Sequence, residues 1–212
     1  MPVSLIPKAL RLLVKVAVVY ILVFVIWIFA APQYHLFLGH VAARLIPLVV
    51  SSDVNRVWYD TGVHYKIDFE TRDSGLDLAP TQTITADAVV DTLHFGYPII
   101  TFLVLALALP GPPWRTRALG IVLGSAIIVL FYSSWMVIAV YQYMSGIEIR
   151  FLQENWIVRL IPPTFYGRYE RGFLVFFGQV LPIATYAALL FRPYWSARKS
   201  PSPGLPTIQR AS

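Results

Sequence analysis

The chain contains no cysteine, which excludes disulfides, metal sites built from thiolates and a cysteine nucleophile. Charge is also scarce, because 13% of the 212 residues are charged, whereas roughly 25% is usual in soluble domains. Apolar residues make up 57% of the sequence, and the mean hydropathy is +0.64. This composition is typical of a protein embedded in a membrane.

Acidic residues are missing from long parts of the chain, since Asp and Glu occur only within residues 53–91 and 148–170. The acid-free parts hold the basic residues that flank the apolar runs, which include Lys8, Arg11, Lys15, Arg115, Arg117, Arg192, Arg198, Lys199 and Arg210. Under the positive-inside rule these basic segments face the cytoplasm. We therefore expect both termini to be cytoplasmic, with residues 53–91 and 148–170 outside.

The net charge of +6 does not indicate a nucleic-acid partner. The basic residues lie in short segments beside apolar runs, where the headgroups of anionic lipids explain them. The bilayer itself is therefore the first expected partner.

Four apolar stretches are candidates for membrane spans. A helix of about 20 residues crosses a bilayer core about 30 Å thick, and the candidates are Leu12–Ala31, Gly96–Leu109, Ala118–Tyr143 and Phe173–Phe191. The second is short and is completed by apolar residues back to Leu93. The first run is followed by a poor cleavage site and by Pro32, which favours an uncleaved signal anchor. We expect a multi-pass protein of the bacterial inner (plasma) membrane.

One region has the alternating pattern of β-strands. Apolar and polar residues alternate without exception over Val63–Glu70, and the turn sequence Asp60–Gly62 would pair this strand with Asn55–Tyr59 as a hairpin. A third strand is expected over Gln82–Val90. The predicted fold class is a mainly α membrane protein with four transmembrane helices. A small extracytoplasmic insertion of two or three antiparallel strands lies between helices 1 and 2.

So small a sheet cannot bury its apolar face alone, because a module of this size has too little core. Its cover must come from the chain's own helices or from another protein. This leaves four candidate partner-docking residues, Trp58, Tyr65, Ile67 and Phe69.

The chain divides into four expected regions. Residues 1–31 form the cytoplasmic N-terminus and the signal-anchor helix, and residues 32–92 form an outer segment with an interfacial helix followed by the β module. Residues 93–192 form a three-helix membrane region with an outer interfacial helix near 147–161. Residues 193–212 are rich in proline and serine and are expected to be a disordered cytoplasmic tail.

The apolar runs contain little that could perform chemistry. The last three have no ionisable residue in their cores, which argues against an ion-coupled carrier. The four histidines have no metal-binding spacing and are interpreted as interfacial or surface residues. Ser133 and Ser134 are expected to bond their own helix or a neighbouring one. We therefore predict no catalytic residue, no cofactor and no metal site.

Two further pairs of residues are candidates for contacts. Gly120 and Gly124 have the spacing that lets two helix backbones approach closely, with an internal or a foreign partner. Arg159 and Arg168 in the second outer connection are candidates for contact with a phosphate or a carboxylate. Glutamates are interleaved with these arginines, so a solvated surface of mixed charge is the favoured interpretation.

The second and third spans resemble a known group of small membrane proteins. The residues that carry the likeness are Tyr97-Pro98, Leu107–Gly111, Trp114, Arg115 and Arg117. Together with the first span and the outer β segment, this pattern resembles the exosortase H-associated family, whose members accompany bacterial exosortases. The resemblance implies an accessory role beside a membrane transpeptidase-like enzyme that processes C-terminally tagged surface proteins. The sorting enzymes rely on a cysteine, so this chain is not such an enzyme.

These observations lead to one preferred function and two alternatives. The preferred function is a non-enzymatic accessory protein that docks an exosortase or its tagged substrates through the outer segment. The first alternative is an enzyme or carrier for lipid-linked or envelope material, with the outer arginines as an anion site. The second alternative is a structural subunit of a membrane complex.

Overall fold

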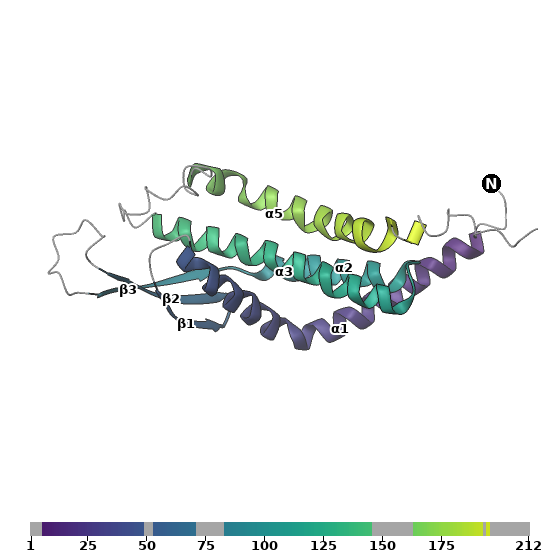
Figure 1. Cartoon of the computed structure of the whole chain (residues 1–212), viewed down its shortest axis with the longest axis horizontal. Coiled ribbons are helices and arrows are strands. Elements are labelled where there is room, and N and C mark those ends of the chain that lie inside the picture. The colour runs from purple at the N-terminus through teal and green to yellow at the C-terminus, as the bar shows by residue number, and fades with distance from the viewer. Residues whose placement is uncertain (1–5, 49–52, 71–82, 146–162, 193, 196–212) are drawn as a thin grey trace, which may run out of the picture.

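The computed structural model describes residues 6–48, 53–70, 83–145, 163–192 and 194–195. This part of the chain is mainly helical, with a three-stranded antiparallel sheet between the first and second helices. The four helices are α1 (Ile6–Leu45), α2 (Gly96–Ala108), α3 (Trp114–Ser145) and α5 (Pro163–Tyr186). The strands are β1 (Asp53–Tyr59), β2 (Val63–Glu70) and β3 (Thr83–Val90) (Figure 1).

Helix α1 is one helix of 40 residues and contains Pro32 in its interior. The sequence predicted a span ending at Ala31 and a separate interfacial helix after it, and that division is wrong. Proline removes one backbone hydrogen bond and costs about 3 kcal/mol inside a helix. The second half of α1 buries Leu38 and Ala42 completely, and this packing keeps the helix continuous through the proline.

Two helices are long and apolar enough to cross a membrane. They lie at Ala9–Leu48 and Trp114–Tyr141, and the first, near the N-terminus, has the character of a signal sequence as well. Two shorter apolar helices cover Gly96–Ala108 and Phe176–Phe191. The first half of α1 exposes apolar side chains over most of its circumference, and the stripe of Val16, Val19, Val23 and Trp27 is partly buried.

The sheet confirms the strand predictions. Strand β2 is central in the order β1-β2-β3, and both pairings are antiparallel. The turn at residues 60–62 joins β1 to β2 as a hairpin, in which Tyr59 lies opposite Val63. Strand β1 carries an irregularity between Val54 and Arg56, which adds one residue on that strand. As a result Val54 and Val57 both pair with inward-facing residues of β2, Ile67 and Tyr65.

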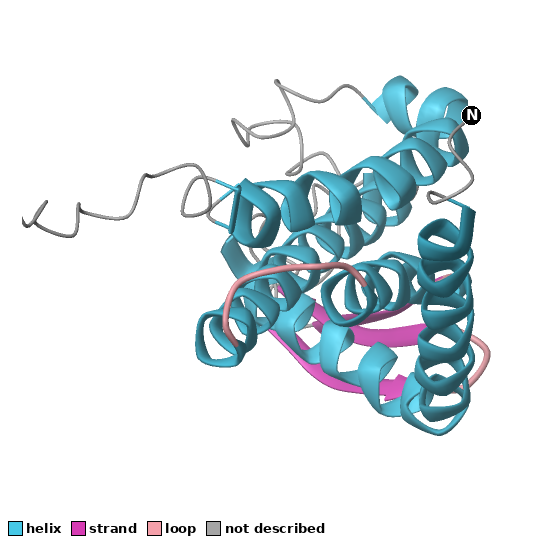
Figure 2. Ribbon diagram, turned by 90° about the vertical axis from the view of Figure 1, so that its right-hand side faces the viewer, coloured by secondary structure: helices cyan, strands magenta, loops and turns pink. Residues whose placement is uncertain are grey.

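The inner face of the sheet and the helices share one core. Val63, Tyr65, Ile67 and Ala88 from the strands are fully buried in the same cluster as Leu38 and Ala42 of α1 and Met136 of α3. The cover that the sequence required thus comes from the chain's own helices. In both views the strands lie against the helices rather than apart from them (Figure 1 and Figure 2).

The basic segments and the sheet lie at opposite ends of the helices. The start of α1, the turn between α2 and α3, and the end of α5 share one end, while the sheet lies along the other halves of α1 and α3 (Figure 1). Helix α5 continues as a π-helical turn, η5 (Ala187–Phe191), at the basic end. The charge segregation read from the sequence is therefore also a segregation in space.

Candidate functional site

The inner face of the sheet is not available to a partner. Tyr65 and Ile67 are both 0% exposed, and the Tyr65 hydroxyl lies 3.8 Å from the Met136 sulfur of α3. Burial raises the pKa of the Tyr65 phenol, so this side chain stays neutral in the core. Both residues belong to the folding core and not to a docking surface. The side chain of Phe69, a third candidate, lies outside the described part of the structure.

Trp58 lies on the opposite, outer face of the sheet and is partly exposed. Its ring stacks on the ring of His64 in the neighbouring strand, with the centroids 5.0 Å apart and the planes inclined by 15°. The Arg56 guanidinium carbon lies 5.5 Å from the centroid of the same indole. Such a cation over an aromatic face is attracted by the ring's quadrupole. Trp58 is thus held between an imidazole and a guanidinium group.

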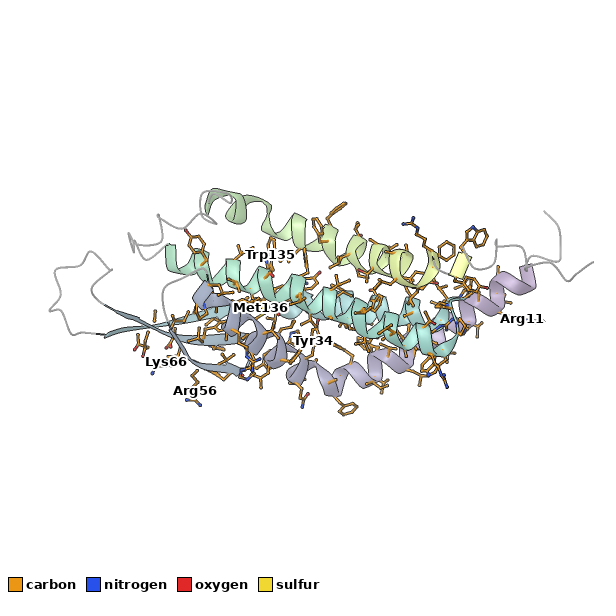
Figure 3. The ribbon with its side chains drawn as sticks, in the orientation of Figure 1. Arg11, Tyr34, Arg56, Lys66, Trp135 and Met136 are labelled. Carbon is orange, nitrogen blue, oxygen red and sulfur yellow. The ribbon has the colours of Figure 1, made fainter. Side chains whose placement is uncertain are left out.

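A second cation lies beside this group. Lys66 is paired directly with Arg56 across the strands, and it is exposed, as is Arg56 (Figure 3). Like charges opposite one another in a sheet repel each other. Asp87 lies opposite Lys66 on the other side and offsets part of this repulsion. We call Arg56, Trp58, His64 and Lys66 the outer-face cluster.

A network of polar groups continues this face toward the far end of the sheet. The Asp68 carboxylate accepts hydrogen bonds from the Asn55 amide and from the Thr85 hydroxyl, the latter at 2.7 Å. One residue from each strand takes part, so the network ties the three strands together. The outer-face cluster therefore sits on a sheet braced on both faces.

Gly120 and Gly124 pack against helices of the same chain. A Cβ atom on Gly120 would overlap the Leu190 side chain of η5, and one on Gly124 would overlap the ring of Phe102 in α2. Both glycines are buried. The sequence left open whether the partner was internal or foreign, and the structure assigns both contacts to internal partners.

Ser133 and Ser134 of α3 bond as the sequence predicted. The Ser134 hydroxyl donates to the Leu130 carbonyl of its own helix at 2.8 Å, and the Ser133 hydroxyl donates to the Leu38 carbonyl of α1 at 3.3 Å. Ser133 therefore links α3 to α1 through the backbone.

A polar group inside the molecule was not predicted. The sequence analysis treated His35 as a surface or interfacial residue, yet it is 5% exposed. Its ring stacks on Tyr59 at 5.4 Å and meets Trp27 and Tyr34 edge to face. His35 Nδ1 and the hydroxyls of Tyr34 and Tyr132 are buried and have no hydrogen-bond partner among the described residues. The cause of the error is that the second half of α1 packs on the sheet.

The remaining candidates cannot be placed. Arg159 and the predicted interfacial helix near 147–161 lie outside the described residues, as does the tail from residue 196 onward. Arg168 belongs to α5, but its side chain is likewise outside the described part. Within the described ranges, no group of three or more His, Cys, Asp or Glu residues is arranged to hold a metal ion.

Comparison with known proteins gives no relative from which a role can be carried over. No protein family, no curated protein and no solved structure matches this chain. The functional argument therefore depends on the chain's own residues, and the outer-face cluster is the surface on which it can be built.

Proposed function

We propose that this chain is a non-enzymatic accessory protein of the bacterial inner membrane, which docks a protein partner through the outer-face cluster. The exosortase-like pattern of residues 97–117 makes an exosortase or its tagged substrates the partner to test. In this proposal all four helices, α2 and α5 included, cross the membrane, and both termini face the cytoplasm.

The composition of the cluster carries the proposal. Trp58 and Arg56 are of the residue types most enriched among the side chains that dominate binding energy at protein interfaces. Stacking and the braced sheet hold them in one geometry. Because little side-chain freedom is left to lose, a partner bound here pays a reduced entropic cost.

The height of the cluster also favours a membrane-anchored partner. The 13 residues of α2 rise about 20 Å from the turn at 109–113, and the three residues of the preceding 3-10 turn, η3 (Leu93–Phe95), add about 6 Å, so that together they approach the thickness of a bilayer core, about 30 Å. Strand β3 ends at Val90, shortly before α2 begins. With the turn at the inner surface, the sheet begins near the outer headgroups and extends away from them. Arg56 and Trp58 then stand where the outer part of a neighbouring membrane protein is within reach.

Docking is tested by replacing Trp58 with alanine. Capture of the partner from native membranes, after brief crosslinking and with mass-spectrometric identification, should fall at least about tenfold, because such anchor residues cost about 2 kcal/mol or more when truncated. The matched control is Phe37→Ala, which removes an aromatic side chain 54% exposed on α1. Equal capture by both variants and the unchanged protein would reject the outer-face cluster as the docking surface.

The identity of what is captured separates the proposal from its alternatives. A sorting transpeptidase or its tagged substrates would support the accessory role. Recovery of lipid alone would favour the handling of lipid-linked material, and Arg159 and Arg168 would then be the residues to change. Recovery of a stable complex of other membrane proteins would favour a structural subunit.

The topology is tested with alkaline phosphatase, which is active only outside the cytoplasm. A fusion after Gly75, in the connection between β2 and β3, should be active, and a fusion after Trp114, at the start of α3, should be inactive. The reverse pattern would place the sheet in the cytoplasm and remove an outer partner from consideration.

A further inference from the structure

At the basic end of the bundle, side chains of α3 and α5 contact the α2–α3 turn, and the proposed docking function does not involve these contacts. The Tyr186 hydroxyl of α5 donates to the Pro110 carbonyl of the α2–α3 turn at 2.8 Å. The Arg117 side chain lies over the same turn, since a Cβ atom on Gly111 would be 2.9 Å from its Nη2 and 3.3 Å from its Nε. Arg117 is half-buried in this position. The turn and the end of α5 therefore form one surface.

Two more arginines lie at the same level. Arg115 is exposed and precedes Arg117 by two residues in α3. Leu190 contacts Gly120, and Arg192 follows Leu190 by two residues in the helix that runs antiparallel to α3. A rise of about 1.5 Å per residue in each helix brings Arg192 level with the start of α3. We call Arg115, Arg117 and Arg192 the turn-end arginines.

The segments that carry these charges contain no carboxylate side chain. Residues 1–52, 92–147 and 171–212 contain no Asp or Glu, and the turn-end arginines and the segments around them all lie in these ranges. A half-buried guanidinium with no neighbouring carboxylate needs an anion from elsewhere, because withdrawing a charge from water is costly when it is unpaired.

Aromatic residues indicate the depth at which this surface sits. Trp114 is 66% exposed at the start of α3, and Trp195 is 44% exposed beyond the end of α5. Trp195 stacks on Phe191 with the ring centroids 5.8 Å apart. Tryptophans are concentrated where a membrane helix meets the headgroups. Trp114 directly precedes Arg115, and Trp195 follows Arg192 by three residues, so the turn-end arginines are expected at the level of the headgroups.

We propose that the turn-end arginines bind the phosphodiester headgroup of an anionic phospholipid, with Arg117 as the central contact. The planar guanidinium donates two parallel hydrogen bonds to a phosphate, which a zwitterionic headgroup satisfies less well because its own ammonium group competes for the phosphate. The acyl chains lie along the apolar surfaces of α3 and η5. This site is independent of any protein partner, since it lies at the other end of the molecule from the outer-face cluster.

The test is lipid retention by the full-length protein. Purified protein is stripped in detergent and titrated with phosphatidylglycerol or with phosphatidylcholine of the same acyl chains, and bound lipid is counted by native mass spectrometry. The unchanged protein should bind phosphatidylglycerol preferentially. The double variant Arg115→Gln/Arg117→Gln should bind it more weakly, by about fivefold for each arginine removed. The control, Arg56→Gln/Lys66→Gln, removes two cations at the opposite end and should bind as the unchanged protein does.

The outcomes that overturn the proposal are distinct from loss of partner docking. Equal affinity for the two lipids, or equal binding by the double variant, would reject the site. Competition by millimolar inorganic phosphate would show a free-anion site in place of a lipid site. If the double variant does not fold, Arg117→Lys and Arg192→Gln provide the same comparison, with lysine keeping the charge and losing the paired hydrogen bonds. In the variants of the turn-end arginines, capture of a protein partner through Trp58 should be unaffected.

Discussion

Replacement of Tyr65 by alanine should lower the free energy of unfolding by about 3–5 kcal/mol, the usual cost of removing a large aromatic side chain from a core. Tyr65 is fully buried in the core that the sheet shares with α1 and α3, and its hydroxyl contacts Met136 of α3. For a chain of this length the midpoint of thermal unfolding in detergent should fall by on the order of 10 °C. Fluorescence-detected melting of the purified protein measures this change.

The neighbouring residue provides the control. Lys66 lies on the outer face of the same strand, and Lys66→Ala should change stability by less than about 0.5 kcal/mol. Tyr65→Phe keeps the ring and removes the hydroxyl that approaches Met136, so it should cost much less than alanine does. A Tyr65→Ala protein that melts normally but loses its partner would restore the docking role that the sequence suggested for this face.

The sheet was predictable because strand periodicity is a local property. Alternation over Val63–Glu70 and the turn at 60–62 fix the hairpin through contacts between residues close in sequence. The cover of the sheet was not predictable, because it depends on which surface of a distant helix meets it. The sequence of α1 does not show whether its apolar residues contact lipid, a partner or the sheet, and only the three-dimensional structure does.

The candidate site was predictable in part for the same reason. Trp58 was one of the candidate docking residues, and the alternation of β2 already placed His64 and Lys66 on the wet face. Apolar alternation pointed to the opposite face of the sheet, so Arg56, the cation beside the indole, was not predicted as part of the site. The pairing of β1 with β2 brings the four side chains of the outer-face cluster together. This register between the strands cannot be read from either strand alone.

The burial of His35 has a related cause. The first span was predicted to end at Ala31 and to be followed by an interfacial helix, and His35 was predicted to be an interfacial or surface residue. Packing of the following turns on the sheet outweighs the local cost of Pro32, so the helix continues and carries His35 into the core. Local propensity is a weak guide wherever tertiary contacts of several residues oppose it.

Replacement of Gly124 by alanine should destabilise the protein by about 1–3 kcal/mol, the usual cost of adding an atom to a packed core. Alanine favours a helix over glycine by about 1 kcal/mol, but here the added methyl group would overlap the ring of Phe102, which is fully buried and cannot swing away. Thermal melting in detergent should show a lowered midpoint.

The same substitution at Gly178 should have the opposite sign, which makes it a matched control. A Cβ atom there would meet its nearest neighbours, the Tyr132 hydroxyl and Pro98, only at 3.6 and 3.8 Å. Gly178→Ala should therefore gain the helix preference without a clash and raise the melting midpoint. Replacing Phe102 with the smaller leucine should make room for a methyl group at position 124. The double variant Gly124→Ala/Phe102→Leu should therefore be destabilised by less than the sum of the destabilisations of the two single variants. Strict additivity, or equal effects at both glycines, would mean that α2 and α3 do not pack through Gly124, and the close approach of these two helices would have to be abandoned.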